Sequence, residues 1–272
     1  MIIMEELKGI ILGAGYGERM RPITNFIPKP LLPVSEKTNI DIIIERMLEI
    51  RIKRIGVNVC HLKGKMKHHL ETYDERIFIS EEERILGTGG GIRRIAEKLN
   101  ADSYLIHNGD IYTEVDLMKV IEKHKKSSYP MTMVVRPGGH DLDLVDGRVD
   151  FTGIGFTYCG VGVMSRDLAI KLQRDLISSV SDQKIRGFIY EGTWFDLGSP
   201  AGYLSCIRHT KGYIAPDADL EGTEIEGYCY VGSGVRLRKG RIKNAVILPG
   251  TVLSDGARIT DGIIAPGSFI NC

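Results

Sequence analysis

The sequence lacks the features of a membrane protein or of a nucleic-acid-binding protein. No apolar run approaches the roughly 20 residues of a membrane-spanning helix, and the opening MIIMEELKGIILGAG carries acidic residues that a secretory signal would not. With 36 basic and 35 acidic side chains, the formal net charge is +1. No general field therefore draws the chain to nucleic acid or to an anionic membrane. We expect a cytoplasmic protein that holds any anionic ligand locally.

Cysteine is scarce and scattered. The five cysteines are Cys60, Cys159, Cys206, Cys229 and Cys272. No two of them form a Cys-x-x-Cys pair, which argues against a zinc site. We expect reduced thiols that behave as small buried hydrophobic side chains.

The first 211 residues alternate short apolar runs with segments of helical period, which is the pattern of strands covered by helices. We predict an α/β fold for this first domain, with a Rossmann-like mixed sheet that is mostly parallel and flanked by helices. Strands are expected at residues 9–12, 54–59, 76–80, 103–107, 131–135 and 153–164.

Three segments carry helix signals. In residues 38–50, Asn39 is the expected N-cap. Residues 199–209 begin with Ser-Pro, a capping serine followed by a proline at the first helical position. In residues 116–126, the side chains of one helix face recur three or four positions apart. That face comprises Leu117, Val120, Ile121 and His124.

Residues 212–272 have a different texture. Glycine becomes frequent and aliphatic residues recur six apart, as at Ile225, Val231 and Leu237. This spacing predicts a second domain, a short left-handed β-helix of hexapeptide repeats in which each coil stacks on the next. A glycine-rich antiparallel sheet is the alternative, but alternation of period two is poor. Because an end coil needs a cap or another subunit, we expect a homo-oligomer formed through this tail.

The stretch LGAGYGERMRPITNFIPKPLLP follows the first predicted strand and has the composition of a phosphate-binding loop. It does not fit the dinucleotide fingerprint, because Glu18 stands where the third glycine belongs. It does not fit the Walker pattern either, because Lys29 lies between two prolines. A long loop that wraps a triphosphate remains. Arg19 offers it a planar fork and Lys29 a point charge. The backbone that would approach the phosphates comprises Leu12, Gly13, Ala14, Gly15 and Gly17.

Two aspartates are candidate metal ligands. Asp110 follows the apolar strand in YLIHNGD, where carboxylates of α/β sheets line the ligand crevice. The alternative for Asp110 is a turn aspartate that bonds to its own backbone. Asp196 lies between apolar residues in TWFDLGSP, where an unpaired charge is costly. Two carboxylates completed by phosphate oxygens and water suit Mg²⁺.

The loop motif, followed by LGTGGG, NGDIY, FTYCGVGV and WFDLG in this order, resembles the sugar-1-phosphate nucleotidyltransferases over about residues 8–210. The resemblance implies an enzyme that joins a nucleoside triphosphate and a sugar-1-phosphate into a nucleotide-sugar and releases pyrophosphate. It implies Arg19, Lys29 and Asp110 as catalytic residues, and Asp110 with Asp196 as the ligands of Mg²⁺.

The resemblance also places the nucleobase near EEERILGTGGG, with Glu82 at the position of a base-contacting side chain and Gly87 and Thr88 beside it. A carboxylate only accepts hydrogen bonds. If Glu82 contacts the base, the site would therefore accept GTP, UTP or dTTP and reject CTP and ATP. The run EEE followed by LGTGG slightly favours GTP with mannose- or heptose-1-phosphate. The alternative is that residues 81–83 are a solvated charge run.

For the sugar, the resemblance implies Gly160, Glu191 and Trp194, with Glu191 contacting hydroxyls and Trp194 as a flat apolar wall. Many relatives carry Glu-Lys-Pro before the sugar-binding strand, whereas this chain reads DGRVDFTGIGF. The lysine that meets the sugar phosphate in those relatives therefore has no certain counterpart, and Arg148 is a weak candidate.

Two other functions are conceivable. Hexapeptide β-helices often belong to acyltransferases, but this tail has no histidine after His209 and so no obvious general base. A non-catalytic subunit that binds a sugar nucleotide would have lost Arg19, Lys29 or an aspartate, and all are present.

Overall fold

The computed structural model describes residues 6–271, which form two compact units. The sheet unit consists of Met1–Gly15 and Ile43–Trp194, and the coil unit of Tyr16–Ile42 and Phe195–Cys272. The glycine- and proline-rich loop is thus divided, with residues 12–15 in the sheet unit and residues 16–33 in the coil unit. The predicted boundary between residues 211 and 212 falls inside the coil unit.

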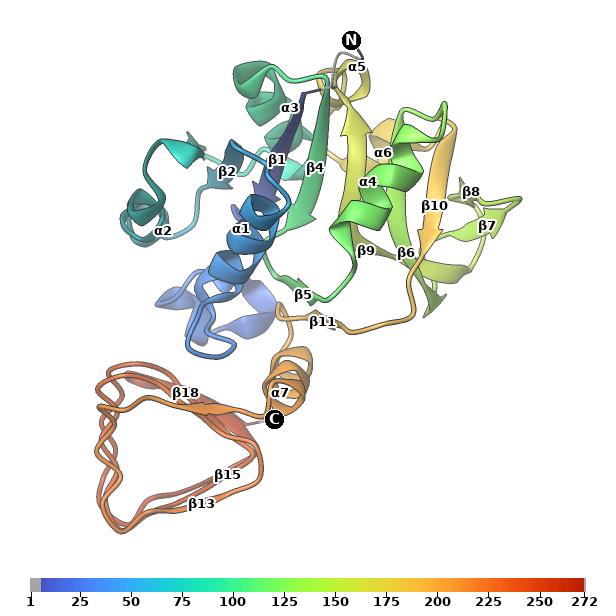
Figure 1. The fold of residues 1–272 in the computed structure, drawn as a ribbon. Coiled ribbons are helices and arrows are strands. Elements are labelled where there is room, and N and C mark those ends of the chain that lie inside the picture. The colour runs from blue at the N-terminus through green and yellow to red at the C-terminus, as the bar shows by residue number, and fades with distance from the viewer. Residues whose placement is uncertain (1–5, 272) are drawn as a thin grey trace. The chain divides into compact units, whose positions relative to one another are not determined.

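The sheet unit contains one mixed sheet, whose strands in the described residues follow the order β3-β2-β1-β4-β9-β6-β10-β8-β7 (Figure 1). The strands are β1 (Leu7–Leu12), β2 (Ile55–Val59), β3 (Ile77–Glu81), β4 (Ser103–Asn108), β6 (Met131–Gly139), β7 (Asp143–Val145), β8 (Arg148–Asp150), β9 (Gly155–Ser165) and β10 (Ile185–Ile189). From β3 to β4 all pairs are parallel, and so is β6 with β10. Strand β9 runs antiparallel between β4 and β6. The predicted mostly parallel α/β sheet is confirmed.

Helices cover both faces of this sheet. The helices of the described residues are α1 (Asn39–Glu49), α2 (Lys63–Leu70), α3 (Gly87–Leu99), α4 (Leu117–Lys125), α5 (Arg166–Ala169), α6 (Leu176–Val180) and α7 (Pro200–His209), of which α7 belongs to the coil unit. Helices α3, α5 and α6 share one core with Met131 and Met133 of β6. Thr132 lies between these methionines and its hydroxyl is 3.0 Å from His124 Nδ1 on α4. Because successive strand residues point to opposite faces, α4 covers the other side.

Of the two predicted helix caps one is confirmed, and the predicted buried face of α4 is confirmed as well. Ser199 caps α7 and Pro200 is its first residue, as predicted. All four side chains of the predicted α4 face are buried. Asn39 is not a cap but the first residue of α1. Thr38 takes the cap position, because its hydroxyl accepts from the Asp41 N–H at 3.4 Å while the Asp41 carboxylate accepts from the Thr38 N–H at 3.1 Å. This reciprocal pair is a capping box.

A short hairpin that the sequence analysis missed extends the sheet at its outer edge. Strands β7 and β8 pair antiparallel across a two-residue turn, Asp146–Gly147. Both turn residues have positive φ, 52° and 73°. Asp-Gly between two strands is a strong hairpin signal, so the dipeptide itself predicts this turn.

In the coil unit, the chain winds through three stacks of parallel pairs, which give the coils a triangular outline in Figure 1. The strands are β12 (Tyr213–Ile214), β13 (Glu224–Glu226), β14 (Tyr230–Val231), β15 (Arg241–Lys243), β16 (Val246–Ile247), β17 (Arg258–Thr260), β18 (Gly262–Ala265) and β19 (Ser268–Asn271). Tyr213 pairs with Tyr230, and Tyr230 with Val246, so one coil takes about 17 residues.

The interior of these coils is aliphatic. Val231, Leu237 and Ile242 are fully buried there, whereas Ile225, which shares their six-residue spacing, is 39% exposed. The last pair, β18 with β19, is antiparallel. Stacked coils require the parallel pairing seen here. Their handedness stays a prediction.

Two remaining predictions concern targeting and cysteine. None of the helices in residues 6–271 combines the length and apolar character needed to cross a bilayer. Cys159, Cys206 and Cys229 are buried free thiols and Cys60 is half-buried. Cys272 lies outside the described residues.

Candidate functional site

The predicted site residues of the sheet unit follow the carboxyl ends of parallel strands. Gly13 follows β1, and Asp110 lies two residues beyond β4. Strand β9 runs the other way, so its first residues reach the same edge. A Cβ added at Gly160, whose φ is +74°, would lie 2.9 Å from Nδ2 of Asn108. Only glycine allows this approach, which puts the predicted sugar residue Gly160 beside the Asn-Gly-Asp motif.

The glycine loop is tied to two neighbouring strands by a buried network. The Gly13 N–H donates to Asn58 Oδ1 at 2.8 Å, and Asn58 Nδ2 donates to Glu82 Oε1 at 2.8 Å. The Leu86 N–H donates to Glu82 Oε2 at 2.9 Å. Asn58 was missed by the sequence analysis. Its signal is a polar residue within IGVNV, a strand that is otherwise apolar and buried throughout.

Glu82 is 1% exposed, so the solvated-run interpretation is wrong for this residue. Glu81 does face outward, where its carboxylate pairs with Lys67 at 2.5 Å. Both Glu82 oxygens already accept a hydrogen bond from the protein. The geometry therefore gives Glu82 a positioning role toward Gly13, and a nucleobase N–H could reach only a remaining lone pair of the carboxylate.

The motif LGTGGG forms the first turn of α3. A Cβ at Gly91 would lie 2.6 Å from Asn58 Nδ2, and a Cβ at Gly87, with φ of +82°, would lie 2.3 Å from the Arg174 carbonyl. The Gly89 N–H donates to that same carbonyl at 3.0 Å. Close packing accounts for these glycines, while the half-buried Thr88 lies between them.

Trp194 is held by two contacts. Its indole N–H donates to the Cys159 carbonyl at 3.0 Å, and the guanidinium carbon of Arg136 lies 5.0 Å from the centroid of its ring. Glu191 is exposed. Arg136, at the carboxyl end of β6, was not among the predicted site residues. No signal in the sequence marks it, because its neighbours Trp194 and Thr157 are distant in the chain.

Among the polar atoms that are buried without a partner in residues 6–271 are Asn108 Oδ1, His107 Nε2 and the Tyr158 hydroxyl. Burial also raises the pKa of Tyr158, so its hydroxyl keeps its proton. Unsatisfied buried polar atoms are costly, and a polar ligand would satisfy them.

In the coil unit, three predicted charged residues meet at Gly198. Arg19 Nη2 donates to Asp196 Oδ2 at 2.8 Å, and the Gly198 N–H donates to Asp196 Oδ1 at 2.8 Å. A Cβ at Gly198 would lie 3.0 Å from Lys29 Nζ and 3.1 Å from Arg19 Nη2. Gly198 was missed by the sequence analysis, although it directly follows Asp-Leu. The Arg19 side chain is 63% exposed, so the cluster is open to a ligand.

The loop that carries these charges packs on itself. Gly17 has a φ of +70°, and its carbonyl accepts from the Thr24 hydroxyl at 2.7 Å. A Cβ at Gly17 would lie 3.1 Å from Cγ of Lys29. Pro28 and Pro30 on either side of Lys29 are buried. The base of this lysine is thereby anchored, as the two prolines predict.

The two predicted magnesium ligands belong to different units, Asp110 to the sheet unit and Asp196 to the coil unit. Both side chains are half-buried. Within residues 6–271, no cluster of three or more His, Cys, Asp or Glu side chains could hold a metal. Any ion held by these aspartates would take its other ligands from phosphate and water.

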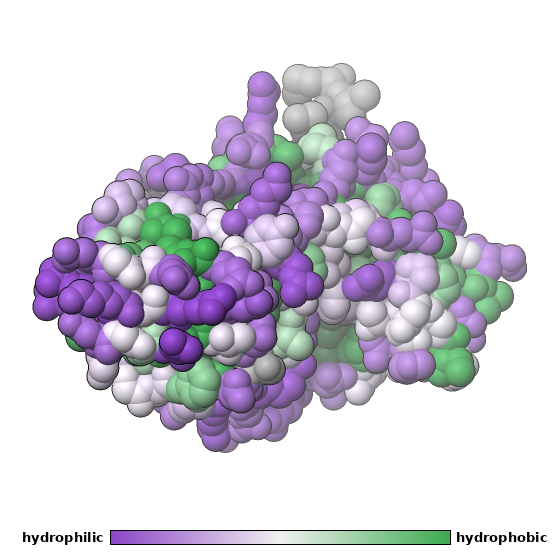
Figure 2. Space-filling view, turned by 90° about the horizontal axis from the view of Figure 1, so that it is seen from below, coloured by the Kyte–Doolittle hydropathy of each residue, from purple (hydrophilic) through white to green (hydrophobic). Residues whose placement is uncertain are grey.

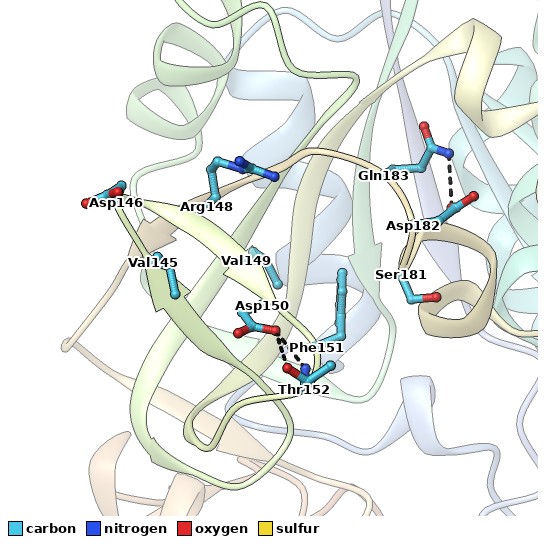
Figure 3. A pocket seen from close by; sticks show the side chains of 10 residues that line it. All are labelled: Val145, Asp146, Arg148, Val149, Asp150, Phe151, Thr152, Ser181, Asp182 and Gln183. Atoms are coloured by element: carbon cyan, nitrogen blue, oxygen red, sulfur yellow. Dashed lines mark hydrogen bonds between the residues drawn. The ribbon is translucent and has the colours of Figure 1, made fainter.

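Arg148 lies elsewhere in the sheet unit. It lines a cavity of about 670 Å³ beside the β7–β8 hairpin (Figure 3). Other lining residues are Asp150, Phe151, Asp182 and Gln183. None of the predicted nucleotide, metal or sugar residues lines this cavity.

Comparisons with known proteins agree with this geometry. Residues 8–142 match the family model described as Nucleotidyl transferase. A mannose-1-phosphate guanylyltransferase of Mycobacterium tuberculosis is 25% identical over 292 residues, covering 97% of this chain and 80% of the relative. A UTP–glucose-1-phosphate uridylyltransferase of Synechocystis is 24% identical over 299 residues, covering 94% and 76%.

The likeness extends to solved structures. The crystal structure of HddC from Yersinia pseudotuberculosis has a TM-score of 0.63 at 20% identity, covering 73% of this chain and 97% of that one. At this identity the likeness shows the fold. The family match and the named relatives identify the class: residues 8–142 carry a nucleotidyl transferase domain, and the protein is a nucleotidyltransferase.

Proposed function

We propose that the protein transfers a nucleotidyl group from a nucleoside triphosphate to a sugar-1-phosphate, giving a nucleotide-sugar and pyrophosphate, with GTP and mannose- or heptose-1-phosphate slightly favoured. The observation that carries the proposal is the meeting of Arg19, Lys29 and Asp196 at Gly198. Arg19 and Lys29 belong to the loop that continues directly from the anchored Gly13, and Asp196 ends the strand β11 (Trp194–Asp196). The guanylyltransferase name of the relative supports the choice of GTP.

The reaction needs no general base. A sugar phosphate is ionised at neutral pH, so one of its oxygens can attack the α-phosphorus in line while the bond to the pyrophosphate oxygen breaks. Catalysis is then positioning and charge neutralisation. The buried histidine of the sheet edge would be a weak base in any case, because burial lowers the pKa of His107 to about 4.

The charged residues divide the work. Arg19 presents a planar fork to the developing pyrophosphate, and Lys29 presents a point charge to the α-phosphate and the attacking phosphate. Asp110 and Asp196 supply the carboxylate oxygens that Mg²⁺ prefers. When bound there, Mg²⁺ would neutralise phosphate charge. Asp196 also keeps the Arg19 guanidinium in position through its 2.8 Å ion pair.

The choice of base has two sources. Glu82 could accept the N–H of guanine, uracil or thymine through a remaining lone pair, or backbone groups near Gly87 could read the base instead. UTP or dTTP is therefore the alternative to GTP, and the uridylyltransferase name of the second relative supports it.

The stacked coils are compatible with the predicted left-handed β-helix. We propose that the protein forms a homo-oligomer through these coils. Several large apolar side chains of the coil unit are exposed, including Ile214, Val252 and Phe269 at 45, 69 and 53%. Hydrophobic side chains also interrupt the mostly hydrophilic surface in the space-filling view (Figure 2). Exposed apolar side chains at the end of stacked coils favour association with another copy.

The test is pyrophosphate release, scanned over five nucleoside triphosphates and a panel of sugar-1-phosphates, with Mg²⁺ or with a chelator. We expect the highest rate with GTP and mannose- or heptose-1-phosphate, dependent on Mg²⁺. For variants that remove a cation of the site, such as Lys29→Ala, a matched control is Lys126→Ala, because Lys126 follows α4 and is an exposed cation outside the site. A preference for CTP or ATP would overturn the base assignment, and no release with any pair would overturn the proposed function.

A further inference from the structure

We propose that Arg136 binds the phosphate group of the sugar-1-phosphate, in the role for which the sequence offers no lysine. This inference rests on the proposed function. It concerns only the sheet unit, where Arg136 and Trp194 are in contact. Its ligand chemistry is a phosphate monoester dianion attached to a sugar ring.

The position of Arg136 suits an anionic ligand. Arg136 follows the buried part of β6 and is opposite Thr157 of β9. Two residues further along β9, the Cys159 carbonyl holds the Trp194 indole, and the next residue is Gly160. The guanidinium therefore lies at the same edge as the buried, unpartnered Asn108 Oδ1.

The guanidinium keeps its hydrogen-bond donors available. Within residues 6–271, the Arg136 side chain makes no ion pair and no hydrogen bond, and its placement comes from the contact with the Trp194 ring. Stacking on an aromatic face holds a guanidinium through its charge and flat surface, without using its five N–H donors. A half-buried cation with unused donors is prepared for a phosphate, which Arg binds bidentately.

The same contact divides the faces of Trp194. Arg136 covers one face of the indole, and the hydrogen bond to Cys159 prevents the ring from turning freely. A sugar ring could therefore stack only on the other face. This arrangement orients a ligand whose sugar packs on tryptophan and whose phosphate reaches the arginine.

The register of the sheet separates Arg148 from this place. Arg148 is opposite Arg186 of β10, and Arg186 is in register with Thr132 of β6. Thr132 precedes Arg136 by four residues, which is about 13 Å along a strand, and β8 lies two strand spacings, about 10 Å, from β6. The Cα atoms of Arg148 and Arg136 are therefore about 16 Å apart, and Arg148 lines the cavity beside the β7–β8 hairpin instead.

Three variants test the proposal: Arg136→Ala, Arg136→Lys and the matched control Arg148→Ala. In steady-state assays, we expect Arg136→Ala to raise the KM for mannose-1-phosphate about tenfold or more, as expected for loss of a charge-assisted contact of the ground state. The KM for the triphosphate should stay unchanged. Arg136→Lys should recover part of the loss, and Arg148→Ala should behave like the wild type.

A binding measurement separates the phosphate contact from a merely structural role. Calorimetry would follow mannose-1-phosphate, and ligand-observed NMR would follow free mannose, with wild type and Arg136→Ala compared for both. We expect the substitution to weaken the phosphate ester and to leave free mannose unchanged. Equal weakening of both ligands would mean that Arg136 only supports Trp194, and unchanged affinity for the ester would overturn the proposal.

The two proposals fail differently. If the wild type released no pyrophosphate with any substrate pair but still bound mannose-1-phosphate through Arg136, the proposed function would fail and this inference would stand. If the enzyme were active and Arg136→Ala left the sugar-phosphate KM unchanged, only the inference would fail.

Discussion

The two units contribute different kinds of site. In the sheet unit, Gly13, Asn58 and Glu82 form a buried network that fixes the backbone of the glycine loop. In the coil unit, Arg19 and Asp196 form an ion pair that is open to solvent, with Lys29 beside it. The network of the sheet unit fixes a backbone conformation, and the cluster of the coil unit supplies charged side chains. Substitutions in the first should therefore change stability and substrate affinity together, whereas substitutions in the second should change turnover or substrate affinity and leave stability nearly unchanged.

The largest effect is expected at the carboxylates. Asp196→Asn and Asp110→Asn should each lower Mg²⁺-dependent turnover about a hundredfold, because under the proposed function each removes a charge that would hold the ion, and such losses are on the order of 3 kcal/mol. Initial rates of pyrophosphate release at saturating Mg²⁺ would measure this, with thermal melting as the check of folding. Near wild-type turnover would make the residue a structural turn aspartate.

The next effect separates the two cations of the loop. Arg19→Ala should lower kcat, on the order of tenfold, because Arg19 acts on charge that develops in the transition state. Lys29→Ala should raise the KM for the triphosphate instead. The exposed ion pair of Arg19 adds little stability, so its loss should leave the melting temperature nearly unchanged. Equal effects of both variants on KM, with kcat untouched, would contradict this division.

A smaller and mixed effect is expected at Glu82. In Glu82→Gln, the new amide would point a donor at either the Asn58 amide or the Leu86 N–H, which already donate to this side chain. A buried donor without an acceptor costs about 1–3 kcal/mol. We expect lower stability in urea and a several-fold higher KM for the triphosphate.

The same variant sharpens the assignment of the base. If Glu82 also reads the base, Glu82→Gln should relax the preference for GTP over CTP and ATP, because an amide both donates and accepts. If selectivity stays unchanged while stability falls, Glu82 only positions Gly13 and the base is read by backbone groups near Gly87.

The smallest effect on turnover is expected from the coils. Full-length protein should be oligomeric in light scattering at micromolar concentration. Removal of residues 213–272 should lower the measured mass of the particle by more than the mass of the deleted residues, because the oligomer should dissociate. The exposed Phe269 offers a milder test, since Phe269→Glu should weaken association without disturbing the coil interior. A monomeric full-length protein would end this idea.

The sheet was predictable because its strands are short apolar runs with clear boundaries, and each of the six predicted strands is present. Helix α3 was not predicted, because its first turn is almost all glycine, a poor helix former. Its glycines are explained by the close approach of Asn58 and the Arg174 carbonyl. Such contacts join distant parts of the chain and cannot be read from local pattern.

The charged residues of the site could be predicted from the sequence, whereas the residues that position them could not. Arg19, Lys29 and Asp196 stand in motifs whose residue types state their chemistry. Asn58 and Arg136 act through contacts that depend on strand register, which no single segment reveals. The six-residue recurrence of the tail found the buried Val231 and Leu237. Ile225 is in register with the buried Ile242 and is exposed because it belongs to the first of the stacked coils.

The β7–β8 hairpin has a practical consequence for protein engineering. It connects β6 to β9 and yet lies at the far end of the strand order, outside every parallel pair. The pairing of β6 with β9 therefore does not depend on the length of the Asp146–Gly147 turn. An affinity tag or a fluorescent reporter inserted there would be carried on the sheet's edge while the register of β6 with β9 stayed intact.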